Sequence, residues 1–147
     1  MGLLARGIAK RRRRNHRALL NGPYPFIQTG DVANCDTYIR SFGATYSELG
    51  LAQSRLWEPG VLCITIAANI AKTGILTFPA CFPDSVVGFI AGERVRTEYV
   101  QLWLSFLQRT LEATAPESAQ KNINLEILRK LQLPVPPVHL QDQFAAM

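Results

Sequence analysis

Apolar residues recur along the chain with two different periods. Between residues 97 and 115 they return every three or four positions, which predicts an amphipathic helix that ends before Pro116. The positions that share this period are Tyr99, Val100, Trp103, Leu104, Leu107 and Leu111. Leu102 and Phe106 widen the apolar side, so we expect this helix to pack into the core, with Trp103, Leu104 and Leu107 buried.

Short runs of apolar and β-branched residues predict strands at residues 26–29, 61–67, 73–78 and 85–90. A short connection at residues 69–72 separates the second run from the third, so we expect these two strands to form an antiparallel hairpin. Residues 80–82 lie between two prolines and are expected at a sheet edge or in a loop.

Capping and turn residues predict two shorter helices. Residues 45–48 (TYSE) have capping-box spacing and predict a helix that runs to Leu56. Asn124 can cap a second helix that ends near Lys130. The proline-rich residues 134–137 (PVPP) then predict an extended linker, after which residues 138–147 begin another element.

These elements predict an α+β fold in which a small mixed or antiparallel sheet packs with several helices. A length of 147 residues fits one domain. We expect a basic, disordered leader over residues 1–21, the folded domain over residues 22–133, and a proline-rich segment over residues 134–147.

Charge is distributed unevenly along the chain. The formal net charge of +5 by itself favours a nucleic-acid partner. Residues 1–17 hold seven cations and no acid, whereas residues 18–147 hold nine cations and 11 acids, a net charge of −2. The basicity therefore belongs to the leader, whose run of like charges is typical of a solvated segment that can contact phosphates without sequence preference.

Several classes of protein do not fit this sequence. No window reaches the roughly 18 apolar residues of a membrane helix. Cys35, Cys63 and Cys81 are widely spaced and only two histidines are present, which argues against a zinc site and a disulfide framework and favours the reducing cytoplasm. A glycine-rich phosphate loop and a nucleophile elbow are missing from the sequence, so we expect no catalysis and no metal site in this chain.

Polar residues follow the ends of the predicted strands. Gln28 and Thr29 end the first strand, and Asn69 and Lys72 lie between two others. Amide side chains bond adenine edges, and lysine bonds guanine edges or phosphates, so these residues are candidates for DNA contacts. Their side chains can also hydrogen-bond to loop backbone groups or simply remain solvated. Composition alone favours this second interpretation over DNA contact.

Five segments, in this order, resemble the target recognition domains of type I restriction-modification specificity subunits. Residues 25–32 (PFIQTGDV) resemble a stretch near the start of these domains, and residues 61–69 (VLCITIAAN) with 75–77 (ILT) resemble their central hairpin. Residues 82–90 (FPDSVVGFI) resemble the segment after it. Residues 120–124 (QKNIN) and 133–137 (LPVPP) resemble the closing pattern, and residues 141–143 (QDQ) the start of the family's spacer helix.

The resemblance implies sequence-specific recognition of duplex DNA within a specificity subunit. In that family one domain recognises one half of a split target, and the subunit directs methylation and restriction subunits. S-adenosylmethionine, ATP and magnesium would then act only in those partners, and this chain would be non-catalytic and hold no cofactor. Specificity subunits usually carry two recognition domains and two long spacer helices, so this chain looks like a truncated half-subunit that could pair with a second half.

The resemblance and the residue chemistry together predict eight DNA contacts. We expect the base-reading and phosphate-binding residues to be Gln28, Thr29, Arg40, Arg55, Asn69, Lys72, Lys121 and Asn122. Two alternatives remain open at this point. A degenerate half-subunit would bind its partner subunits without reading DNA, and the leader could instead bind anionic lipid at a membrane surface.

Overall fold

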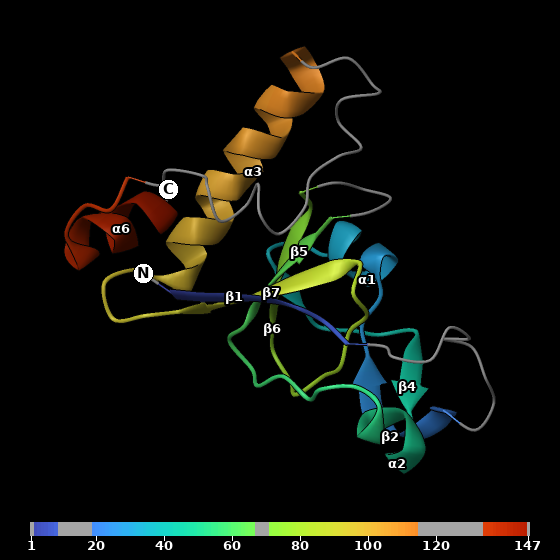
Figure 1. Ribbon diagram of the computed structural model, residues 1–147. Coiled ribbons are helices and arrows are strands. Elements are labelled where there is room, and N and C mark those ends of the chain that lie inside the picture. Colours follow the sequence, from blue (N-terminus) through green and yellow to red (C-terminus); the bar gives the residue numbers. More distant parts are fainter. Residues whose placement is uncertain (1, 9–18, 67–70, 115–133, 147) are drawn as a thin grey trace.

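A computed structural model describes residues 2–8, 19–66, 71–114 and 134–146 (Figure 1). Its main feature is a five-stranded mixed sheet with the strand order β1-β7-β5-β6-β3. The strands are β1 (Gly2–Arg6), β7 (Val86–Ala91), β5 (Leu62–Thr65), β6 (Thr73–Leu76) and β3 (Tyr38–Ile39). Neighbours are antiparallel except β3, which runs parallel to β6. The expected α+β fold with a mixed sheet is confirmed.

The remaining elements lie around this sheet. A two-stranded ribbon pairs β2 (Leu20–Phe26) with β4 (Ala44–Tyr46), and helix α2 (Glu48–Ala52) packs on it. Helix α1 (Thr29–Ala33) contacts β5 and β6. The long helix α3 (Thr97–Thr114) and helix α6 (Val138–Ala145) lie side by side at the other side of the molecule, as Figure 1 shows.

Side chains alternate between the two faces of the sheet, as the pleat requires. Along β5, Leu62 and Ile64 pack under α3, whereas Cys63 faces the opposite side. We call the first side the α3 face; its buried residues also include Val87, Phe89, Tyr99 and Leu104. We call the second side the Trp57 face; it includes Ile27, Val32, Trp57, Phe82 and Val86. Both faces are covered, and all four residues of β5 are accordingly buried.

The prediction of a disordered leader over residues 1–21 is wrong, because residues 2–6 form a strand of the sheet. Strand β1 pairs with β7 from Gly2 opposite Ala91 to Arg6 opposite Val87, and the Gly7 amide donates to the Val86 carbonyl over 2.8 Å. Residues 19–21 are also ordered, with Leu19 fully buried. The sequence of β1 (GLLAR) has no alternating pattern that would predict a strand, and its formation depends on pairing with β7. Residues 9–18 lie outside the described residues.

Two other local predictions are wrong. The strand predicted at residues 26–29 ends at Phe26, and Gln28 instead caps α1. The helix predicted from Thr45 begins only at Glu48, because Thr45 belongs to β4 and the Ser47 hydroxyl accepts the cap hydrogen bond from the Gly50 amide. At residues 27–29 the helix cap ends the predicted strand early, whereas at Thr45 pairing with β2 delays the start of the predicted helix.

The longer elements match their predictions. The hairpin of β5 and β6 is antiparallel, β7 follows it, and α3 covers residues 97–114. Residues 134–137 are extended and lead into α6. The helix predicted at residues 124–130 lies outside the described residues. Leu104 is buried as expected, but Trp103 and Leu107 are only partly buried at the margin of the core.

Candidate nucleic-acid interface

The start of α1 places Gln28 at the surface. Directly after β2, the Ile27 amide donates a hydrogen bond of 2.8 Å to the Cys81 carbonyl, which fixes the chain just before Gln28. The Asp31 carboxylate accepts a hydrogen bond from the Gln28 backbone amide at 2.9 Å, which closes the first turn of the helix. The side chain of Gln28 remains exposed and can reach a ligand.

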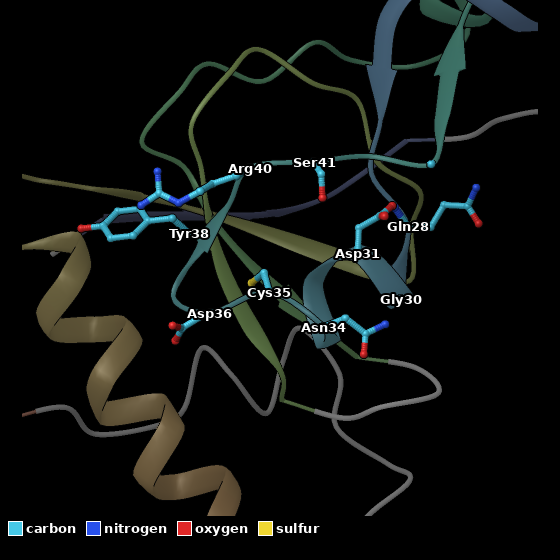
Figure 2. Close-up of a pocket in the computed structure, with 10 residues that line it drawn as sticks. Gln28, Gly30, Asp31, Asn34, Cys35, Asp36, Tyr38, Arg40 and Ser41 are labelled. Carbon is cyan, nitrogen blue, oxygen red and sulfur yellow. The ribbon is translucent and has the colours of Figure 1, made fainter.

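A pocket of about 670 Å³ opens between α1 and the segment around β3. We call it the α1–β3 pocket. It is lined by Gln28, Gly30, Asp31, Asn34, Cys35, Asp36, Tyr38, Arg40, Ser41 and Gly43. Figure 2 shows Tyr38 and Arg40 on one side and Gln28, Gly30, Asp31 and Asn34 on the other. The lining offers amide, carboxylate, hydroxyl and guanidinium groups within one hollow.

Among the described residues that line this pocket, Arg40 is the only cation. Its guanidinium carbon lies 5.3 Å from the centre of the Tyr38 ring, a cation–π distance. The Tyr38 hydroxyl in turn donates to the Glu98 carboxylate on α3 over 3.5 Å. These contacts orient Arg40, which stays exposed, so its guanidinium remains available to an acceptor outside the protein.

A second pocket of about 320 Å³ lies between β6 and α3 and shares Cys35 and Asp36 with the first. We call it the β6–α3 pocket. Lys72 and Arg109 are its two cations. The Gln101 amide donates to the Thr73 hydroxyl over 3.2 Å and to the Ser105 hydroxyl over 3.0 Å. The two pockets therefore adjoin each other beside β3, the edge strand of the sheet.

Two residues of the β6–α3 pocket have a left-handed backbone. Thr37 has φ 62° and Ala71 has φ 61°. This conformation is unfavourable for a β-branched residue such as Thr37, and it persists because neighbouring contacts hold it. The Thr37 carbonyl accepts from the Ile75 amide and the Ala71 amide donates to the Thr65 carbonyl. Backbone strain of this kind concentrates at functional sites, which makes this edge a candidate site.

The structure brings together some of the predicted contacts and separates others. Gln28 and Arg40 line the α1–β3 pocket, Lys72 lines the β6–α3 pocket, and Thr29 is the half-buried first residue of α1. Arg55 lines neither pocket; its guanidinium carbon lies 3.8 Å from the centre of the Trp57 ring. Asn69, Lys121 and Asn122 lie outside the described residues.

Sequence reasoning missed several lining residues. They are Asp31, Asn34, Asp36, Tyr38 and Ser41 in the first pocket, and Gln101, Ser105, Gln108 and Arg109 in the second. A signal existed for the second group, because these residues recur at helical spacing on the polar side of α3. For the first group the sequence carries no such signal, since these residues come from α1, β3 and the connections beside them and share no period.

The Cys35 thiol, which lines both pockets, is not an activated nucleophile. Burial raises the pKa of Cys35, whose thiol donates to the Val32 carbonyl over 3.1 Å, so it stays protonated at neutral pH. Within residues 2–8, 19–66, 71–114 and 134–146 no cluster of three or more His, Cys, Asp and Glu side chains could hold a metal ion.

A mixed sheet that presents two open, polar pockets at one edge defines an α+β binding domain. Residues 8–147 match the family model of the type I restriction modification DNA specificity domain, and the chain belongs to this family. The resemblance seen in the sequence is thereby confirmed.

Solved structures share this fold. The HsdS subunit from Thermoanaerobacter tengcongensis matches 98% of this chain with a TM-score of 0.72 at 16% identity. A chain from "Structural basis underlying complex assembly and conformational transition of the type I R-M system" matches 99% with a TM-score of 0.76 at 16% identity. The type I S subunit from M. genitalium matches 99% with a TM-score of 0.65 at 10% identity. This chain spans 33%, 34% and 35% of those chains, respectively.

The helices were also compared with the requirements of a membrane span. None of those described is long and apolar enough to cross a bilayer.

Proposed function

We propose that this domain recognises one half of a split duplex-DNA sequence within a type I specificity subunit, with the two pockets facing the DNA. The observation that carries the proposal is the convergence of Gln28, Arg40 and Lys72. These residues were selected separately from the sequence for their base- and phosphate-binding chemistry, and they lie around two adjoining pockets of a specificity domain.

The side chains of the α1–β3 pocket suit base edges. Gln28 and Asn34 can each pair an adenine edge in bidentate fashion, and Arg40 can do the same with guanine. The carboxylates of Asp31 and Asp36 can accept a hydrogen bond from the amino group of cytosine. This mixture of donors and acceptors would read sequence better than it would bind phosphate.

The β6–α3 pocket suits the DNA backbone. Lys72 and Arg109 supply positive charge, and the neighbouring hydroxyl and amide groups of Thr73, Gln101 and Ser105 supply neutral donors. Contacts of this type position a protein on the duplex without reading its sequence. The division between the pockets explains how a domain with few cations can still be specific.

Partner subunits would supply the catalysis. In this proposal the chain is a non-catalytic recognition domain, and adenine methylation with S-adenosylmethionine, ATP hydrolysis and magnesium chemistry belong to methylation and restriction subunits. A second recognition domain, on this or another chain, would read the other half of the target. Phosphate affinity would be shared with these partners, which offsets the −2 charge of residues 18–147.

The test is selection from a randomised duplex library by the 147-residue chain in complex with its methylation subunit. The wild-type complex should enrich one short motif. Gln28→Ala should relax the preference at one position by roughly 5- to 150-fold, the worth of one bidentate base contact. Lys72→Ala should weaken binding to all sequences alike and lower the salt dependence by about one ion.

Arg6→Ala is the matched control for Arg40→Ala. Arg6 lies on β1, at the opposite edge of the sheet from β3, and is exposed like Arg40. Loss of the motif with Arg40→Ala and its retention with Arg6→Ala would support the assignment of the pockets. A folded complex that enriches no motif would refute DNA reading and favour the alternative, a half-subunit that only binds its partners.

A further inference from the structure

One buried polar side chain lies far from the two pockets. Gln141 on α6 is fully buried, with 0% of its surface exposed. Its amide nitrogen donates to the carbonyls of Arg94 over 2.9 Å and Pro136 over 2.8 Å. Its amide oxygen accepts from the Arg96 backbone amide over 2.8 Å. Both hydrogens of the amide and its oxygen are therefore engaged, which is the condition for burying such a group.

These three hydrogen bonds join separate parts of the chain. Arg94 and Arg96 belong to the connection between β7 and α3, whereas Pro136 belongs to the extended linker before α6. Strand β7 lies between β1 and β5, inside the sheet. The Gln141 side chain thus joins α6 to the short connection between an inner strand and α3.

The other contacts of α6 are less directional. The Phe144 ring packs edge-on against Tyr99 with 5.6 Å between ring centres, and such apolar contacts tolerate sliding. The Arg96–Asp142 ion pair, at 3.3 Å, is more than half exposed on both sides and is weak for that reason. Tyr99 donates to the Pro134 carbonyl over 2.7 Å, but this bond holds the linker and not the helix. Among the described residues, the Gln141 amide is the side-chain group that holds the helix through several directed hydrogen bonds.

We propose that Gln141 is a positioning residue that sets the direction of α6 relative to the sheet. A planar amide with three backbone partners in fixed places allows one orientation of the helix that carries it. Any segment or partner that is attached through α6 therefore takes its orientation from the recognition domain. The inference concerns geometry within the chain and does not depend on what the pockets bind.

The first test is amide hydrogen exchange in the 147-residue chain. Gln141→Met keeps the length of the side chain and removes every hydrogen bond of the amide. We expect the amides of α6 to exchange at least about tenfold faster, while those of β5 and β7 keep their protection. Gln143→Met is the matched control, because Gln143 lies on the same helix and is exposed. Equal exchange of α6 in both variants would overturn the proposal.

The second test measures the direction of the helix itself. Spin labels at Glu58→Cys and Ala146→Cys, both exposed positions, report the distance between the Trp57 face and the end of α6 in a Cys35→Ser background. We expect one narrow distance distribution with Gln141 and a broad or shifted one with Gln141→Met. A narrow distribution with an unchanged mean would overturn the proposal.

A purely structural role would produce a different result. In that case Gln141→Met would lower the melting temperature of the whole domain and leave α6 as well protected as the sheet. Should Gln141→Met fail to fold, Gln141→Glu takes its place in both tests, because it keeps the acceptor for the Arg96 amide and loses the two donated bonds. The same loss of α6 protection is expected, and full protection would again overturn the proposal.

Discussion

Each face of the sheet contains one tryptophan, and the two side chains differ in how deeply they are buried. Trp57 is 1% exposed and lies at the centre of the Trp57 face, stacked on Phe82 with 4.8 Å between ring centres. Trp103 lies on α3 at the margin of the α3 face and is only partly buried. The helical period of residues 97–115 predicts that Trp103 is buried, whereas no period in the sequence predicts the burial of Trp57. Periodicity thus identifies which side of an element turns inward, and tertiary contacts decide how deeply each side chain is buried.

Backbone pairing explains the position of Trp57. The chain around it forms a bridge with Ala80, in which the Trp57 amide donates to the Ala80 carbonyl over 2.7 Å and the reverse bond is 3.0 Å. Gly88 on β7 leaves the space that the indole ring fills. On the opposite face Trp103 packs only at the margin of the apolar cluster. The following variants compare the two faces, in order of decreasing expected effect.

Trp57→Ala should be the most destabilising change. It removes a fully buried ring that contacts Phe82 and Gly88, so we expect a loss of roughly 3–5 kcal/mol in the free energy of unfolding. Urea denaturation followed by circular dichroism measures it. A loss below that of Trp103→Ala would reverse the ranking of the two faces.

Gly88→Ala tests the same contact from the sheet side. An added methyl group at Gly88 would lie 2.7 Å from one indole carbon of Trp57 and 3.0 Å from the Phe82 ring. Because both rings are buried and cannot move away, we expect a cost of about 1–3 kcal/mol. The double variant Gly88→Ala with Trp57→Ala should cost less than the sum of the two single changes, and additivity would show that the two residues do not interact.

Trp103→Ala should be milder than a buried tryptophan would predict. The partly buried ring loses less contact with the core, and we expect a cost of roughly 1–2 kcal/mol. This value replaces the roughly 3–5 kcal/mol that full burial would imply. The same denaturation experiment checks it, and a cost that equals that of Trp57→Ala would mean that α3 is buried as deeply as the opposite face.

The pH dependence of stability should report the buried thiol of the Trp57 face. Burial raises the pKa of Cys63 well above its ordinary value, so the folded state keeps this proton when the unfolded chain releases it. Stability from this group is complete below pH about 9 and falls as the pH rises further. Cys63→Ala should flatten the decline between pH 9 and 10, and an unchanged slope would assign the decline to other groups.

The sequence predicted the elements that carry an apolar pattern of their own and missed several that do not. The strands β5, β6 and β7 and the helix α3 have such patterns and were predicted. Strands β1, β3 and β4 have no clear pattern of their own and form because a partner strand lies beside them. Their pairing energy is non-local, which no window of the sequence contains.

The candidate site, too, was predicted only in part from the sequence. Gln28, Arg40 and Lys72 were chosen for their chemistry, and the structure places them around neighbouring pockets, but DNA contact by them remains a prediction. Arg55 has the same charge as Arg40 and also lies over an aromatic ring, that of Trp57, but it lines neither pocket. Chemistry of the side chain identifies what a residue can bind, and only its position in the fold determines whether it faces a ligand.

Two glutamines show most clearly which properties the sequence alone cannot predict. The sequence by itself determined the α+β class, the central hairpin, the long helix and the family, because these rest on local periods and on ordered motifs. It could not distinguish Gln28 from Gln141, which are chemically identical. The tertiary structure left the first exposed beside a pocket and buried the second among three backbone partners. The physical reason is that hydrogen-bond partners of a side chain are set by contacts between segments 45 and 47 residues apart, and such contacts exist only after folding.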